Sequence, residues 1–178
     1  MNNQKKDTLI IYNSIYGTSQ IYAKYISEEF CSDVLEYNKN ISLDEISYYN
    51  KIIFISALYA GKLSNIKSFK KIFNKIKDKN IYYILVGLTD TSNIEYYNNA
   101  ISKNFNDDEK ISIKFYFLRG AINFDKLNSK HRFMMNMLKI FLMLKIKKTE
   151  SEKLFIKTFG ENKNFIDRNS ISNIISKL

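Results

Sequence analysis

Several residue types are rare or missing in this chain of 178 residues, and each absence limits what the protein can be. Cysteine occurs once, at Cys31, and histidine once, at His131, so no intrachain disulfide can form and the His/Cys spacing of a metal site is missing. Cys31 is expected to be a small buried hydrophobic residue. Because Gly/Ser-rich linkers, repeats and low-complexity tracts are also missing, we expect residues 1–178 to form a single domain without a metal ion.

Long apolar runs are missing as well. A helix needs about 20 consecutive apolar residues to cross a bilayer, and no run in this sequence reaches that length. The opening stretch MNNQKKDTLIIYN contains an apolar run much shorter than that of a secretory signal peptide. With 45% hydrophobic residues available for a core, the sequence predicts a soluble globular protein that stays in the cytoplasm.

Acidic residues are outnumbered, since 18 Asp and Glu stand against 28 Lys and Arg and give a net charge of +10. A charge of this sign favours a polyanionic partner, whether nucleic acid, anionic lipid or an acidic protein, without distinguishing among them. The chain is rich in Lys, Asn and Ile and contains no Pro or Trp, which indicates a general bias of composition. We therefore do not favour nucleic acid as the partner.

The sequence does contain a regular alternation of apolar runs with segments of helical spacing. The runs rich in Ile, Tyr, Phe or Val that we interpret as strands are residues 8–12, 51–60, 81–88 and 111–118, with a weaker one at 33–37. Unbroken runs of this length are typical of strands covered on both faces. Apolar residues three or four positions apart predict helices over about 19–31 and 66–76. This order predicts an α/β fold, a three-layer sandwich with a parallel five-stranded sheet and helices on both faces.

The five glycines of the chain are placed informatively. Four of them, Gly17, Gly61, Gly87 and Gly120, fall at or just after the end of a predicted strand, where the backbone must turn sharply. In doubly wound sheets, ligands bind outside the carboxyl ends of the strands. These glycines therefore mark the edge of the sheet at which we expect a binding site.

The first strand ends in the stretch NSIYGTSQ, which is rich in hydroxyl groups and has no charge. A helix that starts here presents unpaired N–H groups and a partial positive charge, which suit a phosphate. The hydroxyls of Ser14, Thr18 and Ser19 would add donors, Tyr16 would add another, and Gly17 would let the backbone approach the ligand. The alternative is an ordinary helix start, in which Thr18 or Ser19 caps the helix. The residues alone leave both interpretations open.

Three other classes of α/β protein lack their motifs. The first strand is not followed by G-x-G-x-x-G, as a dinucleotide-binding Rossmann domain requires, and G-x-x-x-x-G-K-[ST], the motif of a P-loop NTPase, is absent. A receiver domain needs acidic residues at its strand ends, but Asn13 and Ser14 stand at the first and Ala57 and Leu58 at the third. These three classes are excluded.

The segment IIYNSIYGTSQIYAKYISEEF resembles the opening of the flavodoxin-like FMN-binding proteins, and IIFISALYAGKLSNIKSFKKIF resembles their second flavin loop with its following helix. The resemblance implies a flavodoxin-like sandwich with FMN as the cofactor. The residues matched to the phosphate loop are Ser14, Tyr16, Gly17, Thr18 and Ser19. Those that would flank the flavin ring are Ser56, Ala57, Leu58, Tyr59, Ala60 and Gly61, and in the third loop, GLTDTSN, they are Thr89 and Asp90.

A finer resemblance is to the protoporphyrinogen dehydrogenase branch of these proteins. The stretch LRGAINFDKLNSKHRFMMNMLKIF is similar to the part of that branch where a basic, aromatic, Met-rich helix follows a glycine, and NFIDRNSISNIISKL resembles its closing turn and helix. The chain departs from the branch in KIKKTESEKLF, where a G-G-E-T-D-like segment is common. The resemblance implies an FMN-dependent oxidoreductase, with a quinone or another redox partner as acceptor, and it assigns no catalytic residue.

The Met-rich segment is predicted to be a helix from residue 127 to residue 148. Between Phe133 and Ile146, eleven of fourteen residues are apolar, and basic residues bracket them from Lys130 to Lys148. This apolar stretch is shorter than the roughly 20 apolar residues that a helix needs to span a bilayer. The helix either packs against the sheet or is partly exposed, with its Met-rich face against a partner protein or the inner face of the membrane and its lysines on lipid phosphates.

The positive charge bears on the chemistry expected of the flavin. The protein around FMN tunes its redox potential by stacking, hydrogen bonds and charge, and a positive surround stabilises the reduced anion. We therefore expect a higher potential than that of an acidic flavodoxin, which suits a dehydrogenase. Two alternatives remain from the residues: a soluble flavodoxin-type electron carrier, and a flavin-free module that binds partners through its basic surface.

Overall fold

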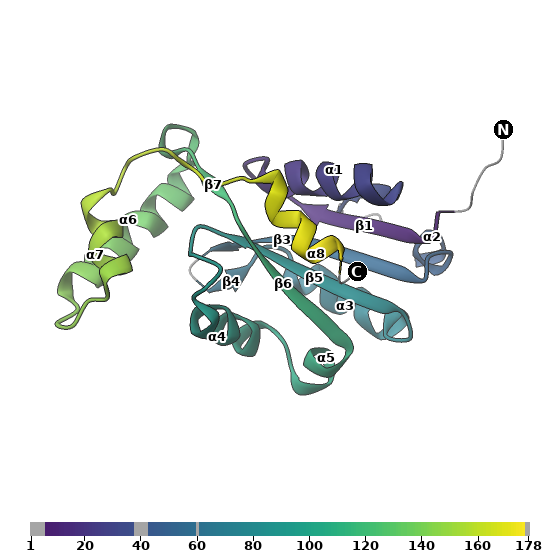
Figure 1. Cartoon of the computed structure of the whole chain (residues 1–178). Coiled ribbons are helices and arrows are strands. Elements are labelled where there is room, and N and C mark those ends of the chain that lie inside the picture. The colour runs from purple at the N-terminus through teal and green to yellow at the C-terminus, as the bar shows by residue number, and fades with distance from the viewer. Residues whose placement is uncertain (1–5, 38–42, 60, 177–178) are drawn as a thin grey trace. The chain divides into compact units, whose positions relative to one another are not determined.

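The computed structural model describes residues 6–37, 43–59 and 61–176 (Figure 1). It divides into two compact units, which we describe separately. The sheet unit consists of residues 1–120 and 165–178, and the inserted unit consists of residues 121–164. The expectation that the whole chain forms one domain stays a prediction.

The sheet unit is built on five parallel strands in the order β2-β1-β3-β5-β6. The strands are β1 (Thr8–Asn13), β2 (Asp33–Glu36), β3 (Lys51–Tyr59), β5 (Asn80–Gly87) and β6 (Ile113–Arg119). This is the strand order of a flavodoxin-like doubly wound sheet, so the predicted fold is confirmed. A short sixth strand, β4 (Lys62–Leu63), pairs antiparallel with the end of β3 and was not predicted.

Helices cover both faces of the sheet (Figure 1). One face is covered by α1 (Thr18–Phe30) and α8 (Ser172–Ile175), which follows the 3₁₀ helix η2 (Arg168–Ile171). The helices that contribute to the other face are α2 (Leu43–Ser47), α3 (Ile66–Ile76) and α4 (Ile94–Asn104), and α5 (Asp107–Ser112) leads into β6. Residues alternate between the two cores along each strand, so that Phe54 of β3 faces α3 and Ile55 faces α1.

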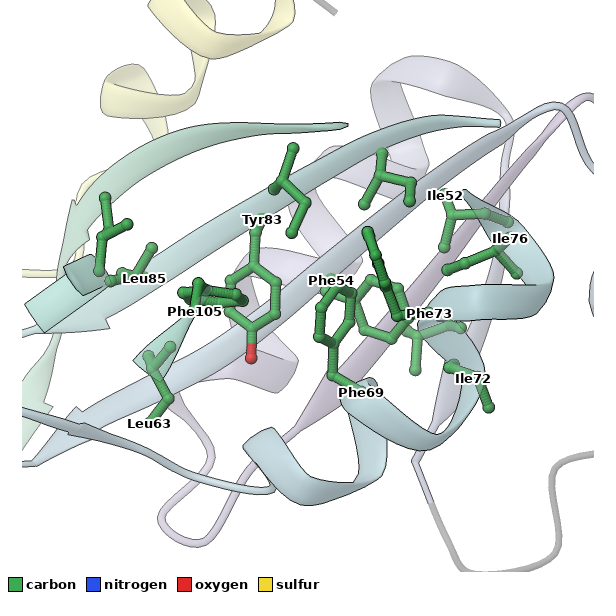
Figure 2. Packing of buried hydrophobic residues seen from close by; sticks show 14 of the residues in the cluster. Ile52, Phe54, Leu63, Phe69, Ile72, Phe73, Ile76, Tyr83, Leu85 and Phe105 are labelled. Carbon is green, nitrogen blue, oxygen red and sulfur yellow. The ribbon is translucent and has the colours of Figure 1, made fainter. Parts of the chain in front are cut away.

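The larger core is rich in aromatic rings (Figure 2). Phe69 of α3 lies at its centre, with ring centroids 4.8 Å from Phe54, 5.1 Å from Tyr83 and 5.7 Å from Phe105, each in an edge-to-face arrangement. Burial raises the pKa of the Tyr83 hydroxyl, which forms a 2.8 Å hydrogen bond with Ser56. This core fixes the helices against the sheet and leaves the strand ends to form the site.

The environment of Cys31 differs from the prediction. Cys31 is exposed and adopts a left-handed conformation with φ 48° at the end of α1. Its amide donates to the Ser27 carbonyl, closing the last turn before the chain enters β2. The residue therefore turns the chain at the surface and does not contribute to the core.

The inserted unit begins and ends in a small antiparallel pair, β7 (Ala121–Ile122) with β8 (Lys163–Asn164). Between them lie the 3₁₀ helix η1 (Phe124–Lys126) and the helices α6 (Ser129–Leu144) and α7 (Glu150–Lys157). The Phe159 ring packs against Phe124 at 5.2 Å and Phe155 at 5.7 Å, measured between ring centroids. The helix that was predicted over 127–148 is observed as Ser129–Leu144, and it ends there because the backbone is extended at Lys145.

None of the helices within the described ranges is long and apolar enough to cross a membrane.

Candidate functional site

The first loop joins β1 to α1 and contains the hydroxyl-rich stretch. Gly17 occupies the N-cap position of α1 with φ 89°, a left-handed conformation that side chains rarely adopt. No side chain of the described residues caps the helix, which begins at Thr18. The alternative in which Thr18 or Ser19 serves as the cap is therefore wrong. The first-turn N–H groups of α1 remain available to an anion, and no acidic residue in the first turn opposes one.

Ser19 is the most unusual residue of this loop. Its side chain is 1% exposed, and its Oγ has no hydrogen-bond partner among the described residues. A buried hydroxyl without a partner costs about 1–3 kcal/mol, so such groups are rare unless a ligand satisfies them. Ser14, Tyr16 and Thr18 are half-buried at the same strand end.

The second loop is a tight hairpin. The strand β3 ends at Tyr59 and the chain returns as β4, with Leu58 opposite Leu63 and Tyr59 opposite Lys62. The hairpin turns through Gly61, which has φ 76°. The predicted site residue Ala60 lies outside the described residues.

An asparagine of α4 holds this hairpin in place. Asn104 donates from Nδ2 to the Gly61 carbonyl at 2.8 Å and accepts from the Leu63 amide at 3.3 Å. Ser56, Ala57 and Leu58 are buried, so their side chains belong to the core of the sheet unit. Tyr59 is half-buried, and its pKa is raised to about 12, first by burial and then by the charge of nearby Tyr16. The first and second loops are neighbours, because they follow the adjacent parallel strands β1 and β3.

The third loop follows β5 and is folded around Asp90. One carboxylate oxygen of Asp90 accepts from the Ser92 amide at 3.0 Å and the Ser92 hydroxyl at 2.8 Å. The hydroxyl of Tyr97 donates to the Thr89 carbonyl at 2.8 Å. The pKa of Asp90 is lowered, first by the hydrogen bonds from Ser92 and then by the positive charge of Arg119. The carboxylate stays charged and keeps the loop closed.

Arg119, at the end of β6, was not identified as a site residue from the sequence. Its guanidinium lies 3.4 Å from Asp90 Oδ2, donates to the Leu88 carbonyl at 3.3 Å, and stands 3.7 Å from the ring centroid of Phe165. Its Nε is buried and has no partner within the described part of the chain. The sequence signal that could have identified Arg119 is its position at the end of an apolar run, just before a glycine. Its contact Phe165 lies 46 positions later in the sequence, so the cluster cannot be recognised from a local pattern.

These segments meet at one edge of the sheet. Because β1, β3, β5 and β6 are parallel, their carboxyl ends all lie at the edge that we call the carboxyl edge. A Cβ placed on Gly120 would stand 3.2 Å from Thr18 Cγ2 and 3.1 Å from Val86 Cγ1, so the end of β6 contacts the start of α1. The structure therefore brings the first, second and third loops together, and Arg119 lies among them.

A family model described as "Flavodoxin domain" matches residues 9–151. The match covers far more than half of the chain, so the chain belongs to the flavodoxin domain family. The match does not distinguish the protoporphyrinogen dehydrogenase branch from other members. No curated protein matches the chain.

Three solved structures are distantly similar. The Trp repressor binding protein from Bacillus subtilis is 13% identical, with 80% of this chain and 99% of that chain covered and a TM-score of 0.44. The Flv1 flavodiiron core from Synechocystis sp. PCC6803 is 16% identical over 66% of this chain and 31% of that chain, with a TM-score of 0.37. A flavodoxin mutant from Fusobacterium nucleatum, bound to flavin mononucleotide, is 16% identical over 68% of this chain and 72% of that chain, with a TM-score of 0.32. The fold assignment therefore depends on the strand order and the family match.

Proposed function

We propose that the chain binds FMN at the carboxyl edge and acts as a flavin-dependent oxidoreductase. The observation that carries the proposal is the start of α1, where an uncapped helix end and the buried, unpartnered Ser19 hydroxyl occur together. A phosphate group would satisfy both, since it accepts hydrogen bonds from helix N–H groups and from hydroxyls. Family membership makes the phosphate of a flavin nucleotide the ligand to test first.

The other loops have roles that fit a ring next to this phosphate. The hydroxyls of Ser14, Thr18 and Ser19 would hold the phosphate, and Gly17 would allow its close approach. The hairpin at Tyr59 and the loop at Thr89 and Asp90 would flank the ring. FMN supplies redox chemistry when it is bound, and the protein orients it and adjusts its potential.

The reaction we propose is a two-electron dehydrogenation that passes electrons to a quinone or another redox partner. Its support is electrostatic, because the sheet unit carries +4 of the net charge and holds Arg119 at the carboxyl edge. Positive charge favours a flavin that carries additional electrons. Protoporphyrinogen IX is the first substrate to assay, on the resemblance of the segment around Gly120 to that branch.

Gly17→Val tests the ligand site. The backbone at Gly17 is strained for any side chain, and no atom lies within 4 Å of an added Cβ, so the valine would occupy space next to the helix end. Gly160→Val is the matched control, because Gly160 has φ 94°, has equally open space, and lies in the inserted unit. We expect FMN affinity, measured by quenching of flavin fluorescence, to fall by about a hundredfold in Gly17→Val, the loss of two charge-assisted hydrogen bonds.

The control variant should bind FMN as the wild type does. Wild-type chain that stays colourless and does not bind added FMN would reject the function, leaving a flavin-free module as the better hypothesis. Flavin binding with a strongly negative potential and no turnover of a reduced substrate would instead favour the soluble electron carrier. Equal FMN affinity of the two valine variants would reject the site.

A further inference from the structure

The helix α6 of the inserted unit has an exposed apolar face. Phe133, Met137, Ile140, Phe141 and Leu144 are spaced three or four residues apart and all are exposed. This spacing places them on one side of a helix, and we call them the apolar stripe. Leu142, on the opposite side of α6, is the residue of this helix that is buried. The helix is therefore anchored by one side and presents the other to its surroundings.

Two more apolar side chains of the inserted unit are exposed near the end of α6 and in α7. Ile146 follows α6 and is 98% exposed, and Leu154 of α7 is 58% exposed. An ion pair of 2.7 Å between Lys145 and Glu152 ties the end of α6 to α7. Monomeric proteins rarely expose apolar side chains in such a contiguous group unless the group has a binding partner.

The charge around the stripe identifies the kind of partner. The inserted unit contains ten Lys and Arg residues and four Asp and Glu residues, which is +6 of the total +10. Three of its four acidic side chains, those of Glu150, Glu152 and Glu161, already pair with lysines. The positive charge is thus concentrated in this unit and is more than a general bias of composition. A second copy of the same surface would be repelled.

We propose that the apolar stripe docks on an anionic lipid bilayer, with α6 lying in the plane of the membrane surface. A basic helix with an apolar face is suited to the boundary between headgroups and acyl chains, where its apolar side enters about 5–10 Å. The lysines at the ends of α6, including Lys147 and Lys148, meet lipid phosphates. A hydrophilic polyanion such as nucleic acid would use the charge and leave the stripe without a role. The stripe and the proposed flavin site are made of different residues, so the membrane test does not depend on FMN binding.

The test is flotation of the full chain with vesicles of phosphatidylcholine, with and without phosphatidylserine. We expect binding to the anionic vesicles and little to the neutral ones. Phe141→Ser with Leu144→Ser should weaken binding by about tenfold or more, because two apolar side chains that would enter the bilayer are lost. Lys147→Gln with Lys148→Gln should weaken it by about thirtyfold, since each lysine contributes about fivefold at an anionic surface.

A matched control is available in the sheet unit. Tyr48 and Ile111 are 65% and 86% exposed and lie outside the inserted unit, so changing both to Ser removes comparable apolar surface elsewhere. This variant should bind vesicles within about twofold of the wild type, as surface changes away from a contact do.

Four results would overturn the proposal. The first is absence of binding to anionic vesicles, and the second is equal binding to neutral ones. The third is weaker binding of the lysine variant together with unchanged binding of the Phe141 and Leu144 variant, which would assign the surface to a hydrophilic polyanion. The fourth is a change in the Phe141 and Leu144 variant of the oligomeric state or the unfolding temperature, without a change in vesicle binding. That result would show the stripe to be covered by protein.

Discussion

Ser19→Ala should have opposite effects on the protein without and with its ligand. Without FMN, the buried Oγ of Ser19 has no hydrogen-bond partner in the described chain, and the unmet hydroxyl destabilises the fold. Replacing it by a methyl group of nearly the same size removes that penalty. We expect the free energy of unfolding to rise by about 1 kcal/mol, which corresponds to an increase of about 2–4 °C in the unfolding temperature.

With FMN, the same hydroxyl would donate to a charged phosphate oxygen. A hydrogen bond to a charged group contributes about 1.5–3 kcal/mol, so its loss should weaken FMN binding by roughly 10–150-fold. The two effects are measured separately, by urea unfolding of the flavin-free chain and by titration with FMN. A variant that is more stable but binds less tightly is the expected outcome.

Ser32→Ala is the control. The Ser32 Oγ is likewise buried and without a partner among the described residues, but it lies just before β2, at the opposite end of that strand from the carboxyl edge. Its replacement should stabilise the flavin-free chain similarly and leave FMN affinity unchanged. Loss of stability in Ser19→Ala would show that the hydroxyl is satisfied within the chain. Unchanged FMN affinity would show that it does not contact the ligand.

Two further variants test the neighbouring contacts. Arg119→Gln removes the ion pair with Asp90, so we expect faster amide hydrogen exchange in residues 88–92 and a lower flavin potential. Arg119→Lys should largely restore both. Unchanged exchange in Arg119→Gln would show that the arginine does not hold the loop. Tyr83→Phe leaves the buried Ser56 hydroxyl without its partner and should cost about 1–3 kcal/mol in urea unfolding with FMN affinity unchanged. If Tyr83→Phe costs as much stability in a chain that also carries Ser56→Ala as it does in the wild type, the loss does not come from that hydrogen bond.

The central strands could be predicted from the sequence because burial on both faces leaves a continuous apolar run. The strand β3 was expected over residues 51–60 and is observed as Lys51–Tyr59. The strand β4 could not be predicted, since it is two residues long and is held by Asn104, which lies 41 positions after Leu63. Local patterns carry no information on a contact of that kind.

The candidate site was predictable to a similar degree. The first loop was identified from its hydroxyls and from Gly17, which are adjacent in the sequence. Whether Thr18 or Ser19 capped the helix could not be decided without the backbone conformation, because both are good capping residues. Arg119 was missed because its partners Asp90 and Phe165 come from distant parts of the chain. The sequence also could not decide whether the Met-rich helix is covered, since burial depends on how its neighbours pack.

The inserted unit leaves the sheet and returns to it at one place. The amide of Phe165 donates to the Gly120 carbonyl at 3.1 Å, and β7 and β8 pair immediately beyond that bond. The strand order of the sheet therefore does not depend on the segment between these two residues, and the entropic cost of closing such an inserted segment grows only slowly with its length. Gly120 and Phe165 form a graft point at which evolution or an engineer can lengthen, shorten or exchange a segment. The surface that the protein presents to its surroundings can change in this way while the carboxyl edge keeps its chemistry.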